Sequence, residues 1–379
     1  MSKDPKIISY FKHMGEHAAS DLYLTVGFPP SMRTDNGIKK LSDKALTAEE
    51  INEMLGFILT PRQRREYETN MELNTSLDAG AHGRYRVNVL RQRQSPALVV
   101  RRIISTIPTF EDLHLPSLLG GLALEKRGMV LVTGMTGSGK STTLASMINY
   151  RNSQEAGHII TIEDPIEYFY EHKESLVTQR EIGVDTETYA IALKNALRQR
   201  PDVILVGEIR DREVMEHALT ASETGHLCLS TLHTNNASQS IERIVNMFPE
   251  DYHDQIRLNL AMNLHAIVSQ RLVPAVSGRL VVALEIMLNQ GLIRKLIQQG
   301  EISKIRGVMQ KNVQLGMCTF DQSLIRLFKA GEITEETALS FSDQPGDMKI
   351  RIHQMQFEGP DDDGDGFSRL DTSSLIIKE

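Results

Sequence analysis

The spacing of apolar residues differs between the first hundred positions and the rest of the chain. Up to residue 108, short runs in which apolar and polar residues alternate are separated by stretches with helical spacing. The alternating runs lie at 22–26, 73–78, 84–91 and 97–104, and the helical stretches at 5–19, 47–59 and 61–68. Residues 1–108 are therefore predicted to form a small α+β domain with antiparallel strands.

Two local signals support this domain. Thr47 and Glu50 stand three residues apart at the start of a helical stretch, which is the spacing of a capping box. Asp35-Asn36-Gly37 falls between two strand-like runs and predicts a hairpin turn. The next segment, 109–117, has prolines near both ends and is the expected linker.

From residue 118 onward, short, mainly apolar runs alternate with helical stretches such as 185–200. These runs lie at 129–132, 158–162, 203–206 and 227–232. Buried strands joined by helices predict a mainly parallel sheet with its ligand at the carboxyl ends of the strands. Beyond about residue 237 we expect mostly helix, with one apolar stripe that contains Ile256, Leu260, Leu264 and Ile267.

A phosphate-binding loop follows the first of these strands. Gly134-x-x-x-x-Gly139-Lys140-Ser141 lies between an apolar run and a helical stretch, which is the context that this motif requires. Its glycines let backbone N–H groups point at phosphate oxygens, with the ammonium of Lys140 on the β- and γ-phosphates and the Ser141 hydroxyl on Mg²⁺. The sequence therefore predicts that the chain binds a nucleoside triphosphate. The predicted nucleotide-binding residues are Gly134, Thr136, Gly137, Ser138, Gly139, Lys140, Ser141 and Thr142.

Candidate catalytic groups follow the other predicted strands. Glu163 comes directly after one strand, where a carboxylate can orient or deprotonate an attacking water. Glu208 follows four apolar residues in a Walker B arrangement, with Gly207 in the usual aspartate position, and is expected to hold Mg²⁺ with Ser141. His226 and His233 flank the next strand, and taken alone each histidine is more typical of a structural role.

Composition restricts the remaining possibilities. The chain has 379 residues, 40% hydrophobic and 24% charged, and a formal charge of −7, so it has no bulk attraction for nucleic acid. Its two cysteines, Cys228 and Cys318, form no metal-binding or disulfide pattern, and we find no signal-peptide core or membrane-length apolar run. We therefore expect a cytoplasmic protein that reaches a membrane only through partners. Residues 343–379 carry nine acidic and four basic residues, and most of this segment is predicted to be a mobile or loosely docked tail.

Together, four segments resemble the Walker A, Asp, Walker B and His boxes of the secretion and type IV pilus ATPases. They are Gly134–Thr142, Ile162–Glu167, Ile204–Asp211 and Thr224–Thr234. The resemblance covers about residues 1–340 and is closest to the type IV pilus retraction ATPases of the PilT/PilU type. It implies an α/β fold, with a RecA-like P-loop NTPase domain (118–342) preceded by a smaller PAS-like α+β domain. It also implies a homohexamer that uses ATP and Mg²⁺ for pilus retraction and twitching motility.

Residue roles follow from the same resemblance. It implies that Glu163 is the catalytic carboxylate, Glu208 the Walker B acid, and His226 and His233 the His-box pair. Arg86 and Arg101 resemble the arginine fingers of the family, although other arginines crowd the same region and a solvated basic sheet face is the alternative. The implied partners are the inner-membrane platform protein of the pilus and a second retraction ATPase, with no nucleic acid and no direct membrane insertion.

Three departures favour the accessory PilU group of this family. Leu292–Ile297 matches the Ala-Ile-Arg-Asn-Leu-Ile motif of the main motors at four positions, Gln199-Arg200 replaces an acidic pair, and the acidic tail is additional. The alternative within the family is a pilus assembly or type II secretion ATPase. Two other classes remain as alternatives: a RecA-like nucleic-acid translocase, disfavoured by charge and 5% aromatics, and a nucleotide-binding scaffold without turnover.

Overall fold

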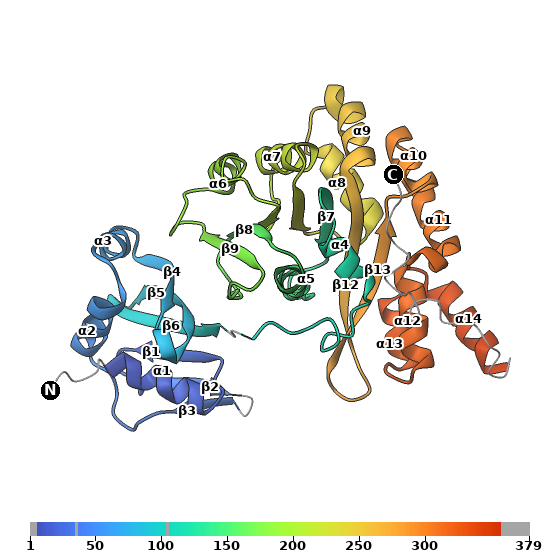
Figure 1. The fold of residues 1–379 in the computed structure, drawn as a ribbon. Coiled ribbons are helices and arrows are strands. Elements are labelled where there is room, and N and C mark those ends of the chain that lie inside the picture. The colour runs from blue at the N-terminus through green and yellow to red at the C-terminus, as the bar shows by residue number, and fades with distance from the viewer. Residues whose placement is uncertain (1–5, 35–36, 104–105, 358–379) are drawn as a thin grey trace. The chain divides into compact units, whose positions relative to one another are not determined.

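The computed structural model describes residues 6–34, 37–103 and 106–357 and divides into two compact units (Figure 1). The first unit contains Met1–Thr106 together with Glu167–Phe169, and the second contains Ile107–Ile166 and Tyr170–Glu379. Within the described ranges, no helix combines the length and the apolar character needed to span a membrane.

The first unit is a six-stranded antiparallel sheet in the order β3-β2-β1-β6-β5-β4. Its strands are β1 (Asp21–Thr25), β2 (Ser31–Thr34), β3 (Gly37–Lys40), β4 (Glu72–Asp78), β5 (Arg84–Gln92) and β6 (Ser95–Ile103). Its helices are α1 (Lys6–Glu16), α2 (Ala48–Ile58) and α3 (Pro61–Asn70). The predicted α+β character and antiparallel pairing are confirmed.

Local sequence explains the helices of this unit. Thr47 accepts a hydrogen bond from Glu50 N, and Glu50 accepts one from Thr47 N, so the predicted capping box opens α2. The apolar face of α1 places Phe11 against the ring of Tyr85, with the ring centroids 4.1 Å apart. Thr34 pairs with Gly37 in the predicted hairpin, whose turn residues 35–36 lie outside the described residues.

The second unit is a seven-stranded sheet in the order β13-β12-β7-β11-β10-β8-β9. All neighbours are parallel except β12 and β13. The strands are β7 (Gly128–Thr133), β8 (Gly157–Glu163), β9 (Ser175–Glu181), β10 (Val203–Val206), β11 (Leu227–Leu232), β12 (Leu264–Pro274) and β13 (Leu280–Leu288). The central strands are buried along their whole length, because helices cover both faces.

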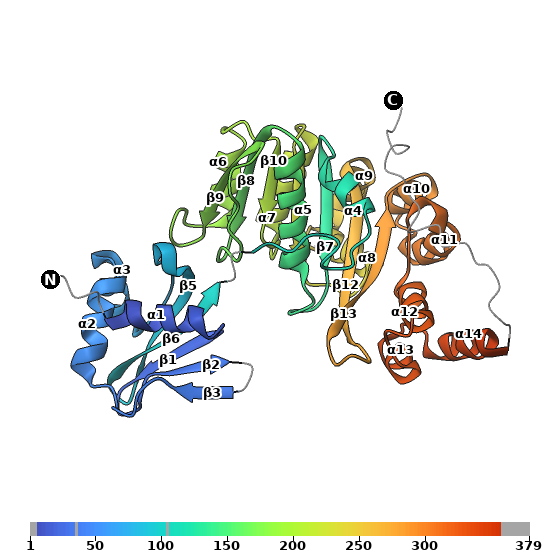
Figure 2. The same cartoon turned by 60° about the horizontal axis from the view of Figure 1, so that its bottom comes forward.

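Helices α4 (Leu118–Ala123) and α5 (Lys140–Gln154) lie on one face of this sheet, and α6 (Tyr189–Ala196) and α7 (Arg212–Glu223) on the other (Figure 1). The remaining helices are α8 (Ala237–Asn246), α9 (His253–Asn263), α10 (Leu292–Gln299), α11 (Ile305–Lys311), α12 (Phe320–Lys329), α13 (Glu335–Phe341) and α14 (Pro345–Phe357). Figure 2 shows α10 to α14 gathered beyond β13, at one end of the sheet. The predicted α/β class with a parallel nucleotide-binding sheet is confirmed.

The expected helical stretch after residue 237 is interrupted by the β12–β13 hairpin. Of the predicted apolar stripe, Ile256 and Leu260 lie in α9, whereas Leu264 and Ile267 lie in β12. A strand covered on both faces is apolar at consecutive positions, so its residues also satisfy helical spacing. The helix predicted over 185–200 is likewise shorter, because α6 begins after its N-cap Thr188 and ends at Ala196.

The segment predicted as a linker, 109–117, belongs to the second unit. Phe110 and Leu115 are 7% and 8% exposed, and the Phe110 ring packs 5.2 Å from that of Tyr150 in α5. Ser146 of α5 also donates a hydrogen bond to Pro108 O. The boundary between the units therefore falls at Thr106–Ile107, before the prolines that suggested the linker.

The predicted mobile tail begins too early, since residues 345–357 form α14. Met348 and Ile352 stand one helical turn apart and are 1% and 0% exposed, in a cluster with Phe320 and Leu324 of α12. The acidic composition concealed this short apolar face. The rest of the predicted tail, 358–379, lies outside the described residues.

Candidate nucleotide site

The phosphate loop connects the end of β7 to the start of α5. Gly134 and Gly139 adopt φ values of +149° and +87°, and Gly139 forms the N-cap of α5. A Cβ on Gly134 would lie 2.4 Å from Ser138 Oγ and 2.6 Å from Gln270 O, so this position accepts only glycine. The loop therefore has the tight curl that directs backbone N–H groups at an anion.

Lys140 lies over this loop. Its side chain is buried, and Nζ donates hydrogen bonds to Gly134 O at 2.9 Å and Met135 O at 3.0 Å. The buried hydroxyl of Ser138 has no hydrogen-bond partner within the described part of the chain. A loop with a buried ammonium and a buried hydroxyl available to donate fits the anionic phosphates of a nucleotide.

Four parallel strands, β7, β8, β10 and β11, end at the edge of the sheet that carries this loop. Glu163 is the last residue of β8. Glu208 comes two residues after β10, and His233 comes directly after β11. Because these strands are parallel to β7, their carboxyl ends share its edge of the sheet. The structure thus places the predicted acids and His233 at the edge that carries the phosphate loop.

The two acids at this edge have different surroundings. Glu163 is 8% exposed and accepts hydrogen bonds from Thr161 Oγ1 at 2.7 Å and Gln179 Nε2 at 3.3 Å. Glu208 forms an ion pair with Arg210, and its other oxygen lies 3.2 Å from His233 Nε2. The hydrogen bond that Arg210 donates to Glu208 raises the pKa of Arg210. Thr161 and Gln179 therefore help to fix the Glu163 carboxylate, whereas Glu208 is linked to the strand that carries His233.

Tyr189 is a neighbour of this site that the sequence did not assign to it. A Cβ on Gly207 would lie 2.9 Å from Tyr189 Oη and 3.4 Å from Glu163 Cα, so glycine stands where a Walker B arrangement usually has aspartate. Burial, and then the charges of Asp164 and Glu208, raise the pKa of Tyr189. Gly207 was the available signal in the sequence for this neighbour, because a residue without a side chain leaves space that Tyr189 occupies.

His226 lies at the opposite edge of the sheet from the phosphate loop. It precedes β11, and its carbonyl accepts a hydrogen bond from Gly128 N at the start of β7. Its Nδ1 lies 3.1 Å from Ala221 O and 3.1 Å from Thr224 Oγ1, at the end of α7. The six residues of β11, at about 3.3 Å each, separate it from the carboxyl edge by about 20 Å. Within its own chain, His226 does not join the site that the resemblance implied for it.

Arg86 and Arg101 lie in the first unit, directly opposite each other on β5 and β6. Arg101 Nε donates to Asp21 Oδ1 at 2.9 Å, and this hydrogen bond raises the pKa of Arg101. Their side chains are 37% and 65% exposed, respectively. Two adjacent exposed guanidinium groups are compatible with an anionic partner, and their role as arginine fingers stays a prediction.

A pocket of about 520 Å³ borders the first half of the phosphate loop, Gly134–Ser138. Its other walls come from the start of α8, from Gln270–Leu272 of β12 and from Ser340–Asp343. Arg271 holds the last of these segments through Phe341 O at 2.7 Å and Asp343 Oδ1 at 2.6 Å. No sequence pattern indicated this wall, because its residues are distant from every motif.

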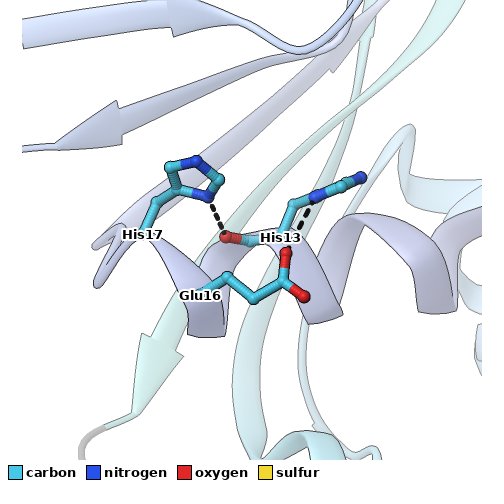
Figure 3. A group of neighbouring side chains, drawn as sticks. All are labelled: His13, Glu16 and His17. Atoms are coloured by element: carbon cyan, nitrogen blue, oxygen red, sulfur yellow. Dashed lines mark hydrogen bonds and ion pairs between the residues drawn. The ribbon is translucent and has the colours of Figure 1, made fainter.

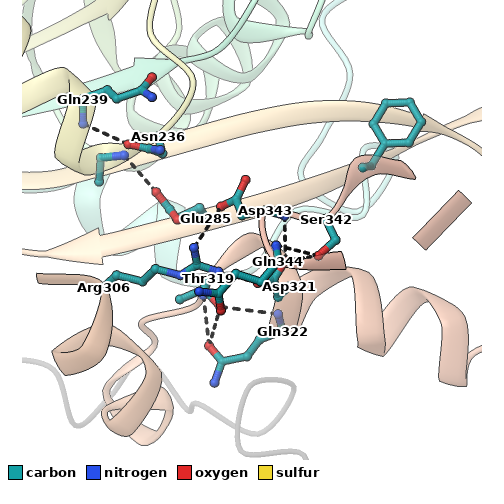
Figure 4. Close-up of polar contacts among 12 residues, drawn as sticks. Asn236, Gln239, Glu285, Arg306, Thr319, Asp321, Gln322, Ser342, Asp343 and Gln344 are labelled. Atoms are coloured by element: carbon teal, nitrogen blue, oxygen red, sulfur yellow. Dashed lines mark hydrogen bonds and ion pairs between the residues drawn. The ribbon is translucent and has the colours of Figure 1, made fainter. Parts of the chain in front are cut away.

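A polar network behind the pocket fixes two of its walls (Figure 4). Asp321 accepts hydrogen bonds from Ser342 Oγ at 2.7 Å and Asp343 N at 2.9 Å, and it pairs with Arg306. Glu285 accepts a hydrogen bond at 2.8 Å from Ala237 N, at the start of α8, and burial raises the pKa of Glu285 to about 7. The C-terminal helices are thereby connected to the environment of the phosphate loop.

Comparison with known proteins agrees with this geometry. Residues 86–301 match the family described as type II/IV secretion system protein. The type IV pilus ATPase PilU of Pseudomonas aeruginosa is 46% identical over 96% of this chain and 94% of its own length. The type IV pilus retraction ATPase PilT of the same organism is 40% identical over 85% of this chain and 94% of its own length.

A solved structure is similar as well. The crystal structure of the pilus retraction motor PilT with bound ADP superposes with a TM-score of 0.86 and 43% identity, covering 92% of this chain and all of that one. Fold and site define a P-loop ATPase with a RecA-like domain and a smaller N-terminal domain. The chain belongs to the type II/IV secretion system protein family.

Proposed function

We propose that this chain is a Mg²⁺-dependent ATPase that powers type IV pilus retraction. The observation that carries the proposal is the single sheet edge that holds the phosphate loop, Glu163, Glu208 and His233. The similarity to PilU and PilT supports the choice of pilus retraction over pilus assembly, secretion or nucleic-acid translocation.

The site residues divide into binding and catalytic groups. Backbone N–H groups of 134–139 and the ammonium of Lys140 bind the phosphates. The buried carboxylate of Glu163 accepts a proton from the attacking water while Thr161 and Gln179 hold it in place. His233 Nε2 lies 3.2 Å from Glu208, so a change at the γ-phosphate that His233 senses would reach Glu208.

A magnesium ion fits the oxygen donors at this edge. Ser141 and Glu208 would hold it, since hydroxyl and carboxylate oxygens are the ligands that Mg²⁺ prefers in such sites. When bound, the ion neutralises charge on the phosphate oxygens. Arg86 and Arg101 supply further positive charge for the γ-phosphate in the assembled ring.

The proposal extends to the assembly. We infer a cytoplasmic homohexamer that attaches to the inner-membrane pilus machinery through the platform protein and works as an accessory motor beside a second retraction ATPase. The accessory role rests on the identity of 46% to PilU against 40% to PilT, and on the altered motif at Leu292–Ile297.

Pilus retraction in cells that carry this protein as the only family member tests the proposal. Retraction that returns with the wild-type chain and fails with Lys140→Ala supports a motor that acts alone. Retraction only when a second retraction ATPase is co-expressed, and lost with Lys140→Ala, supports the accessory role. Normal retraction with Lys140→Ala in both backgrounds would contradict the proposed function.

A further inference from the structure

Three potential metal ligands lie together on the solvent side of α1, in the first unit. His13, Glu16 and His17 each present one ligand atom, and these atoms lie within 4.8 Å of one another (Figure 3). All three residues are exposed. Their spacing of i, i+3 and i+4 places them on one helical face. Another face of the helix holds Ile7, Tyr10, Phe11 and Met14 in the core.

Hydrogen bonds already fix the tautomer of each ring. His17 Nδ1 lies 3.0 Å from His13 O, and a carbonyl oxygen can only accept, so this nitrogen carries a proton. His13 Nδ1 lies 3.2 Å from Glu16 Oε2, where the carboxylate accepts in the same way. Each neutral ring therefore keeps its lone pair on Nε2, and the two Nε2 atoms point away from each other in Figure 3. A metal ion shared by both histidines requires the rings to turn, which their exposure allows.

The position of the cluster on the helix also favours a cation. The three residues occupy the last turn of α1 and the position after it, where the chain leaves the helix through Ala18 at φ +48°. The helix dipole places partial negative charge at this end. The neighbouring charge is that of Lys12, whose Nζ lies 4.0 Å from Glu16 Oε1. This ammonium does not occupy the imidazole nitrogens.

We propose that His13, Glu16 and His17 form a site for a divalent transition metal ion such as Zn²⁺, Ni²⁺ or Cu²⁺. One nitrogen of each imidazole is a principal ligand, and Glu16 contributes its carboxylate. Imidazole nitrogen suits these ions, whereas Mg²⁺ and Ca²⁺ require sets of oxygen ligands. A metal that bridges positions 13 and 17 binds the folded helix and not the unfolded chain, so it stabilises the first unit.

Metal titration of the untagged full-length protein tests the site. The wild-type protein is expected to bind one equivalent of Zn²⁺ per chain that the mutated proteins do not bind. This Zn²⁺ should raise the Tm as its concentration increases, and a chelator should remove it. His13→Ala and His17→Ala should each weaken this binding by about tenfold or more. Glu16→Gln should weaken it by less. His114→Ala removes another exposed histidine and serves as the matched control, with unchanged binding.

Histidine ring NMR provides the independent measurement. Zn²⁺ should shift the ring signals of His13 and His17 together, while Mg²⁺ at the same concentration leaves them unchanged. Absence of a Zn²⁺-dependent shift at these two residues would overturn the proposal. So would a binding curve that is the same for wild type, His13→Ala and His17→Ala.

Discussion

A histidine flanks each end of β11, and the two histidines have different surroundings. His233 follows the strand and contacts Glu208 at the edge that holds the phosphate loop. His226 precedes the strand and closes the end of α7 through Ala221 O and Thr224. In a parallel sheet, only the carboxyl edge collects loops that can bind a ligand. Strand direction, more than residue type, therefore decides which motif residues meet the nucleotide within one chain.

Lys140→Ala should give the largest contrast between the two edges. The buried ammonium on Gly134 O and Met135 O is the charge that meets the phosphates. Its loss should lower turnover by about 10²- to 10³-fold, as for other fixed charge-stabilising donors. Steady-state phosphate release measures the effect. Lys126→Ala is the matched control, since Lys126 is exposed just before β7 at the amino edge, and it should leave turnover unchanged. Equal losses of turnover in Lys140→Ala and Lys126→Ala would contradict the proposed difference between the two edges of the sheet.

Glu208→Gln tests the link between strands β10 and β11. The amide keeps the shape but removes the charge that pairs with Arg210 and faces His233. We expect turnover to fall about 10- to 100-fold and the Mg²⁺ concentration for half-maximal rate to rise. Rates measured across a Mg²⁺ series give both values. An unchanged Mg²⁺ requirement would remove Glu208 from the proposed metal site.

Two truncations test the C-terminal helices that border the pocket beside the phosphate loop. Ending the chain after Phe357 should leave the Tm and nucleotide binding unchanged. Ending it after Ser342 removes Asp343, Met348 and Ile352, and the lost burial of at least about 2 kcal/mol should lower the Tm by about 5 °C or more. Thermal unfolding and nucleotide titration compare the two proteins. A shorter chain as stable as the longer one would mean that α14 contributes nothing to the core.

The histidine pair gives the smallest and most selective effects. His226→Ala removes contacts worth about 1 kcal/mol and should lower the Tm by about 2–4 °C, with nucleotide affinity unchanged. His233→Ala should leave the Tm nearly unchanged and slow turnover, because its contact is with Glu208. Calorimetry and kinetics on both variants test this. A weakened nucleotide affinity in His226→Ala would place that residue at the site after all.

The sequence predicted those features that depend on short-range chemistry. The glycines and lysine of the phosphate loop, the capping box at Thr47 and the buried strands before Glu163 and Glu208 all follow from local patterns. Features set by long-range packing were missed. The β12–β13 hairpin, the burial of Met348 and the insertion of Tyr189 beside Gly207 depend on neighbours that are distant in sequence. The edge of the sheet at which His226 lies could be predicted only from the direction of β11, which the structure shows.

The most direct test of the central claim is Glu163→Gln, studied for nucleotide binding and hydrolysis in the same sample. The amide preserves the contacts with Thr161 and Gln179 in shape but cannot accept the proton of the attacking water. We predict ATP affinity within about twofold of wild type and a kcat lowered by about 10²- to 10⁴-fold. A normal kcat with normal affinity would contradict the assignment of catalysis to this edge of the sheet.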